Sequence, residues 1–120
     1  MLTVKETFID IAENYCPDNV FLQGSLNPEI PYPETFITFF ITSSEFNSFY
    51  NNDANRIDWS LSVMIYSTDP DMIDTIATGI IKDLKNAGFF PTSAGVDLPS
   101  DVETHTGWAL DFIYPEYKTN

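Results

Sequence analysis

The most regular pattern in the chain is an alternation of apolar and polar residues between positions 57 and 67. The apolar side chains fall at every second position: Ile57, Trp59, Leu61, Val63 and Ile65. A period of two predicts a β-strand with one face in the core. At about 3.3 Å per residue, the run from Arg56 to Ser67 spans about 40 Å. A compact domain of this length is only about 35 Å across, so one end of the strand is expected to project from the body.

Several other stretches predict strands and turns. Residues 35–42 are dense in β-forming residues, and residues 104–114 alternate between two faces, so both predict strands. Shorter strands are expected at residues 20–23 and 89–90. Residues 91–103 are rich in Pro, Gly and Asp, which is typical of a loop.

Two segments have apolar residues at helical spacing. The first is residues 3–15. The second begins at Pro70, after an N-cap at Thr68 or Asp69, and Gly88 is its expected left-handed end. The order α-β-β-α-β, with extra short strands, predicts a single α+β domain over the whole chain. Its two helices are expected to pack on a mainly antiparallel or mixed β-sheet, with a hairpin arm protruding.

The connection between the two central strands, residues 43–55, has an unusual length and composition. Hairpin loops are normally two to five residues long, and longer structureless connections usually bind something. This one is polar but carries three aromatic residues, and exposed aromatic side chains are frequent anchors of protein interfaces. We therefore predict an arm or loop that contacts other proteins through Phe46, Phe49, Tyr50, Asn51, Asn52 and Asp53. The alternative is that the aromatic rings fold back onto the core.

Acidic residues dominate the charge of the chain. Eighteen Asp and Glu stand against five Lys and Arg, which gives a net charge of −13. Sequence-specific binding of nucleic acid and binding to an anionic membrane are both disfavoured, because both need clustered basic residues. The remaining interpretations are a partner with a basic surface, a surface that repels or imitates nucleic acid, and solubility alone. No apolar run approaches the ~20 residues of a membrane span, and no signal peptide is evident, so we expect a cytosolic chain.

The residues that usually carry chemistry are sparse. Cys16 and His105 are the single cysteine and the single histidine, so an intrachain disulfide and a cysteine zinc cluster are excluded. Asp97, Asp101 and Glu103 precede His105, which leaves a metal site or a small hydrolase as a minor alternative. No phosphate-binding glycine loop is present. We expect no catalytic residue, no metal, no cofactor and no enzymatic activity.

Three stretches resemble the small tail-completion proteins of long-tailed bacteriophages and prophages, a group that includes tail terminators and tail-to-head joining proteins. The stretches are Pro31-Tyr32-Pro33 leading into Phe36-Ile37-Thr38-Phe39-Phe40, Tyr50-Asn51-Asn52-Asp53 through Trp59 to Pro70, and Thr104 through Gly107-Trp108 to Phe112. The order of the predicted elements also fits.

The resemblance implies a non-enzymatic virion protein. Such proteins form homo-hexameric rings at the head-proximal end of the tail, after assembly in the host cytoplasm. Their expected partners are further copies of the chain, the tail tube protein and the head-completion or connector protein. The resemblance does not separate a terminator from a joining protein. The acidic surface fits a ring through which DNA must pass without sticking. The alternative function is that of an acidic DNA mimic that inhibits a basic nucleic-acid enzyme.

Overall fold

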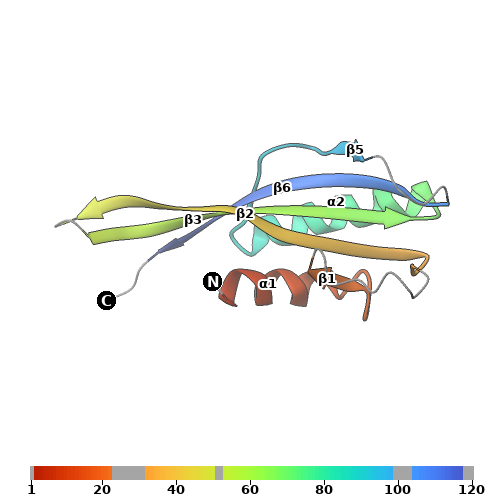
Figure 1. Ribbon diagram of the computed structural model, residues 1–120, viewed down its shortest axis with the longest axis horizontal. Helices are drawn as coiled ribbons and strands as arrows, with labels where there is room; N and C mark the ends of the chain where they lie inside the picture. Colours follow the sequence, from red (N-terminus) through yellow and green to blue (C-terminus); the bar gives the residue numbers. More distant parts are fainter. Residues whose placement is uncertain (1, 23–31, 51–52, 99–103, 118–120) are drawn as a thin grey trace.

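The computed structural model describes residues 2–22, 32–50, 53–98 and 104–117, and its architecture is α+β, as predicted (Figure 1). Two helices accompany a mixed sheet of six strands. The elements follow one another in the order α1 (Leu2–Ala12), β1 (Val20–Leu22), β2 (Thr35–Tyr50), β3 (Asp53–Ser67), α2 (Pro70–Asn86), β4 (Phe90–Pro91), β5 (Val96–Leu98) and β6 (Thr106–Tyr117).

The strands lie in the order β1-β2-β3-β6-β4, and β5 pairs with β6 further along the same side as β4. The short strand β1 runs parallel to β2, and the other pairs are antiparallel. The centre of the sheet is therefore formed by its three longest strands, β2, β3 and β6. The sequence predicted all three, but it ended β2 and β6 too early and began β3 too late.

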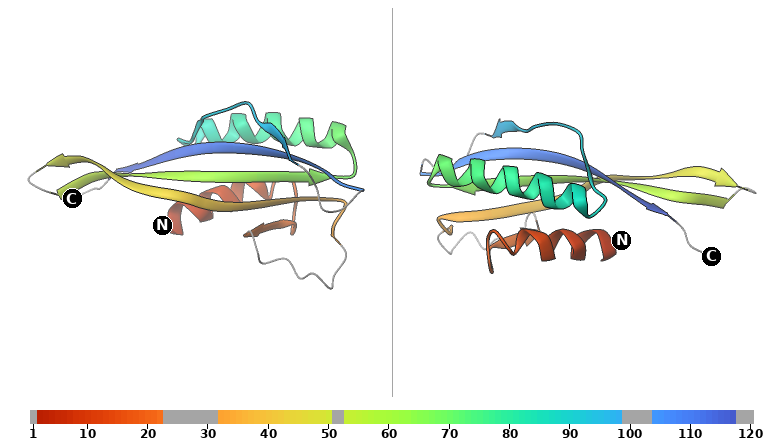
Figure 2. Two further views of the ribbon diagram at one scale, coloured as in Figure 1. Left: turned by 45° about the horizontal axis from the view of Figure 1, so that its top comes forward. Right: turned by 180° about the vertical axis from the view of Figure 1, so that it is seen from behind.

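Both helices pack on one face of the central sheet (Figure 2). The face of β3 predicted from its alternation does point into this core. Phe8 of α1 contacts Phe39 of β2, with ring centroids 4.9 Å apart, while α2 packs on β3 and β6. The fully buried strand residues on this face are Ile37, Leu61, Val63, Ile65, Leu110 and Phe112. Burial of these side chains is the main force that holds the layers together.

Helix α2 begins and ends as its sequence predicts. The Asp69 side chain accepts a hydrogen bond from the Asp71 backbone N–H at 3.0 Å, and Pro70 occupies the first helical position. After the helix, Gly88 adopts a φ of 98°, a conformation that other residues rarely adopt.

Helix α1 ends at Ala12, earlier than predicted, and the chain then turns so that Tyr15 reaches α2. The Tyr15 hydroxyl donates a hydrogen bond to the Asp83 carboxylate. This bond, together with partial burial, raises the pKa of Tyr15 to about 12. The Tyr15 ring lies against Gly79, where an added Cβ would come within 2.5 Å of it. Gly79 thus allows the turn after α1 to approach α2 closely.

The predicted loop at residues 43–55 is wrong. Strand β2 continues to Tyr50 and β3 begins at Asp53, and the two strands stay paired up to Tyr50 and Asp53. The register shifts between Ile41 and Ser43, which marks a β-bulge at Thr42. The resulting hairpin projects well beyond both helices (Figures 1 and 2). The molecule measures 54 × 28 × 23 Å, so the predicted protruding arm is present, but as a strand pair.

Candidate functional site

The arm is the end of the sheet that projects from the body, and we define it as residues 43–50, 53–60 and 113–117. At its base, Trp59 and Tyr114 still pack against the core. Its three segments belong to β2, β3 and β6 and are paired with one another. Phe46 pairs with Ile57, which in turn pairs with Glu116, so these three side chains form a row on the helix-facing side of the sheet. No described helix reaches this row (Figure 1).

Phe46 is the best-defined of the predicted interface residues. Its side chain is 66% exposed, so it does not fold back onto the core. Phe49, Tyr50 and Asp53 lie in the paired ends of β2 and β3, where Phe49 is opposite Ala54 and Tyr50 is opposite Asp53. The remaining two predicted residues, Asn51 and Asn52, lie outside the described residues.

The arm contains a local balance of charge. Glu45 and Asp58 are directly opposite each other on β2 and β3, an arrangement in which like charges repel. Arg56 lies on the same face, with its Nε 2.8 Å from an Asp58 carboxylate oxygen. The hydrogen bond with Asp58 raises the pKa of the Arg56 guanidinium above its usual range. This ion pair offsets part of the repulsion and leaves these three side chains with a net charge of −1.

The sequence interpretation missed the contribution of β6 to the arm. It ended the last strand at Tyr114, yet β6 continues to Tyr117, which pairs with Arg56. Tyr117 is 64% exposed, close to the exposure of Phe46 on the other side of the arm. The arm thus presents an exposed aromatic side chain on each of its two outer strands.

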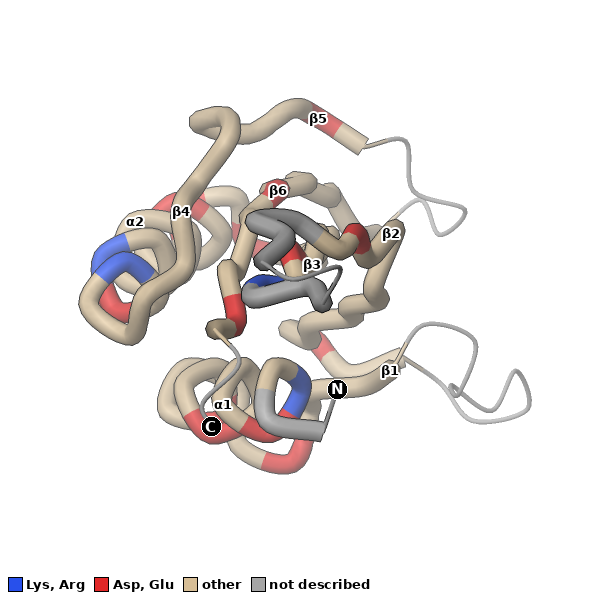
Figure 3. Tube along the Cα trace, turned by 90° about the vertical axis from the view of Figure 1, so that its left-hand side faces the viewer, with Lys and Arg blue, Asp and Glu red and all other residues tan. Residues whose placement is uncertain are grey.

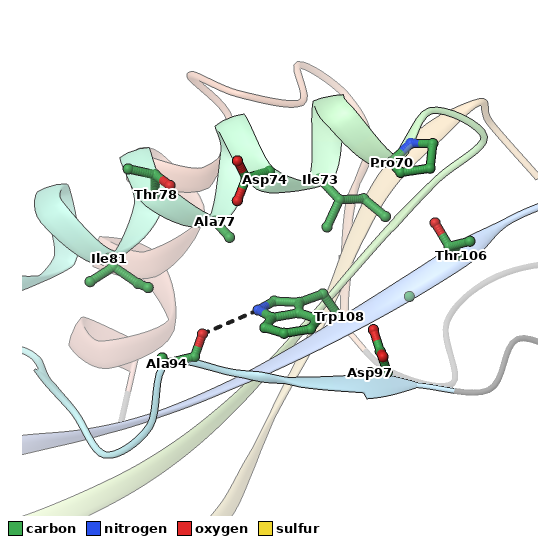
Figure 4. A pocket seen from close by; sticks show the side chains of 11 residues that line it. Pro70, Ile73, Asp74, Ala77, Thr78, Ile81, Ala94, Asp97, Thr106 and Trp108 are labelled. Atoms are coloured by element: carbon green, nitrogen blue, oxygen red, sulfur yellow. Dashed lines mark hydrogen bonds between the residues drawn. The ribbon is translucent and has the colours of Figure 1, made fainter.

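A groove of about 510 Å³ lies at the other side of the body, between α2 and the β5–β6 edge (Figure 4). Trp108 lies in its middle and donates a hydrogen bond from Nε1 to the Ala94 carbonyl at 3.3 Å. Gly95 has a φ of 114°, and a Cβ there would come within 1.9 Å of Trp108 Nε1. The bend at Gly95 therefore makes room for the indole.

The chemistry of the groove suits binding better than catalysis. Its walls are mostly apolar, and Asp74 of α2 and Asp97 of β5 stand on either side of Trp108 (Figure 4). An indole face with nearby carboxylates favours a positively charged group. The lining residues include no His, Cys, Lys or Arg. This groove was not predicted, because its two sides come together only through the pairing of β5 with β6.

His105 has a structural position. It is 8% exposed, and its Nε2 lies 2.8 Å from the Pro33 carbonyl oxygen. A carbonyl only accepts, so Nε2 donates and Nδ1 accepts from the Thr104 hydroxyl at 3.0 Å. The ring also packs edge-on against Phe36, with centroids 5.7 Å apart. Both ring nitrogens are thus engaged, and the bond from Nε2 joins the start of β6 to the chain before β2.

The other candidate groups do not form a reactive centre in the part of the chain that the structure describes. Cys16 is buried, and burial raises its pKa to about 11, so it is a neutral thiol at physiological pH. Asp97 is exposed on β5, while Asp101 and Glu103 lie outside the described residues. Among the described residues, no group of three or more His, Cys, Asp and Glu side chains could hold a metal ion. Nor is any described helix long and apolar enough to cross a membrane.

Comparison of the sequence with protein-family models and with curated proteins finds no match. The arm, the groove and the distribution of charge are therefore the features that bear on function.

Proposed function

We propose that this chain is a non-enzymatic structural subunit that assembles into a ring, as a phage tail terminator or tail-to-head joining protein. The observation that carries the proposal is the arm. Three paired strands extend beyond the helices and expose Phe46 and Tyr117, which contribute nothing to the core of this chain. A rigid extension with exposed aromatic side chains is typical of a protein interface. A ring subunit needs such a surface to reach a neighbouring subunit.

The distribution of charge supports the same proposal. Figure 3 shows Asp and Glu on both helices and on β5 and β6. An acidic chain suits a ring whose opening must let DNA move, because like charge prevents adhesion. A DNA mimic would need its acids in rows that match the two phosphate backbones, and the sequence has no regular acidic stripe of that kind.

Arm shortening tests the proposal. Glu45 and Asp58 are opposite each other, so residues 46–57 can be replaced by a two-residue Asn-Gly turn that joins these strands. Among the removed residues whose side chains the structure describes, Phe46, Arg56 and Ile57, none belongs to the core, so thermal unfolding is expected to change little. Negative-stain electron microscopy would show rings, or particles at the ends of tail tubes of the same phage, for the full chain only.

Two outcomes would contradict the proposal. One is that the full chain forms no rings and binds no tube end. The other is that the shortened chain assembles as well as the full chain, which would remove the arm from the assembly mechanism.

A further inference from the structure

The outer strand of the arm has an open edge. Strand β1 pairs with β2 only as far as Phe39, whereas β2 continues to Tyr50. Within the described residues, no strand lies beside β2 on the side away from β3 beyond that point. The backbone N–H and C=O groups that point outward from residues 43–50 are therefore available to another strand. At about 3.3 Å per residue, this open stretch is about 26 Å long.

Most of the other described edges carry features that discourage strand pairing. Prolines, charges and short length all protect an edge. Strand β4 contains Pro91, β5 contains Asp97, and the β6 side of the arm contains Pro115 followed by Glu116. Strand β1 is only three residues long. Residues 43–50, Ser-Ser-Glu-Phe-Asn-Ser-Phe-Tyr, contain no Pro and no Lys. The longest open edge is thus also the least protected one.

The same strand is almost free of charge. Glu45 is the single charged residue among the 16 of β2, although the chain as a whole carries a net charge of −13. Two copies of a chain with this charge repel each other over most of their surfaces. A contact between copies is most favourable where charge is lowest. A basic partner protein, in contrast, would gain more from the acidic surfaces of the helices.

We propose that a second copy of this chain adds a strand to the outer edge of β2, between Ser43 and Tyr50. A closed ring requires a heterologous contact, so the added strand comes from a segment of the second copy other than its own β2 edge. Main-chain hydrogen bonds supply the affinity, as in other cases of strand addition. The exposed Phe46 side chain then becomes a cross-strand contact of the neighbouring copy. This inference depends on the self-association in the proposed function, and it specifies the surface through which copies join.

A matched pair of substitutions tests this surface. Phe46→Lys places a charge on the proposed edge, and Phe90→Lys makes the same change on β4, where Phe90 is 60% exposed. Each substitution reduces the net negative charge by one, so non-specific repulsion between copies falls equally in both. We expect Phe46→Lys to raise the self-association dissociation constant at least tenfold, about 1.4 kcal/mol. We expect Phe90→Lys to leave it within about twofold of the parent chain. Circular dichroism verifies that both variants fold.

Amide hydrogen exchange provides a readout that does not depend on a substitution. When the purified chain is concentrated until it associates, backbone amides of residues 43–50 should exchange more slowly, and those of residues 114–117 should not change. Association without slower exchange at residues 43–50, or equal weakening by both Lys variants, would overturn the proposed edge and leave the ring proposal intact. A chain that does not associate at any concentration would overturn pairing between copies. In that case the binding of tail tube ends still tests the proposed function separately.

Discussion

The contact between Tyr15 and Gly79 predicts that Gly79→Ala destabilises the protein when Tyr15 is present and stabilises it when Tyr15 is replaced by alanine. An alanine Cβ at position 79 would lie 2.5 Å from both Cε1 and the hydroxyl oxygen of Tyr15. Carbon atoms in favourable contact are about 3.5–4.0 Å apart, so the ring would have to move by about 1 Å or more. That movement would break the hydrogen bond from Tyr15 to Asp83.

The magnitudes decide the net effect of Gly79→Ala on the free energy of unfolding. Replacing glycine by alanine inside a helix stabilises by about 1 kcal/mol. Losing a half-buried hydrogen bond to a carboxylate costs about 1.5 kcal/mol, the low end of the range for charged partners. Displacing the ring adds about 1 kcal/mol, the low end for overpacking. We therefore expect Gly79→Ala to destabilise the protein by about 1.5 kcal/mol.

In a Tyr15→Ala background, neither cost applies, because the ring and its hydrogen bond are gone. Gly79→Ala should then stabilise by about 1 kcal/mol. The coupling energy between the two positions is about 2.5 kcal/mol, within the range measured for residues in contact. Urea unfolding of the parent chain, both single variants and the double variant, followed by circular dichroism, gives this value. The same effect of Gly79→Ala in both backgrounds would refute the close approach of Tyr15 to α2.

Two further predictions concern the groove and the dependence of stability on pH. Gly95→Ala should destabilise the protein by at least about 2 kcal/mol in urea unfolding, because alanine disfavours a φ of 114° and its Cβ would collide with Trp108. The control Ser93→Ala, in the same bend, should have almost no effect. Equal effects of the two substitutions would contradict the fit of Trp108 under this bend. The pKa of Tyr15 is about 12 in the folded chain, above its usual value of 10.0, so the stability it contributes is complete below pH 10 and is lost as the pH rises from 10 to 12. Tyr15→Phe should reduce that loss in unfolding experiments across this range, and an unchanged pH profile would show that Tyr15 has no such role.

The sequence predicted those strands and helices whose pattern is set by a packed core. Helix α2 is the best case, since its N-cap at Asp69, Pro70 at the first position and Gly88 after its end are all local signals. The central part of β3 is predicted equally well, because one of its faces packs under the helices and its sequence must alternate.

The arm was predicted less well for two physical reasons. The bulge at Thr42 changes which residues of β2 face the helices, from Ile37 and Phe39 to Ser44 and Phe46, so a continuous period of two is lost. Beyond the bulge there is no helix to pack on, so the strands need no apolar face and their sequence resembles a loop. Strand β6 continues through Pro115 because this residue lies at the edge of the sheet, where proline is tolerated.

The residues of the arm and of the groove also differ in how far the sequence alone could predict them. Phe46 could be selected from the sequence because an aromatic residue in a polar segment is conspicuous. Tyr117 could not, because its position in the arm depends on the antiparallel register that places it beside Arg56. The groove around Trp108 depends on β5, a strand of three residues that has no pattern of its own. Pairing between distant segments is the information that a single sequence lacks.

The absolute mass of the purified chain in solution tests the central claim most directly. Light scattering after gel filtration, repeated across protein concentration, gives this mass without assumptions about shape, which matters for a molecule 54 Å long. The account predicts a mass six times the 13.6 kDa of one chain, or a mass that rises toward that value with concentration. A mass of 13.6 kDa at every concentration up to the solubility limit would contradict a subunit that assembles with its own copies.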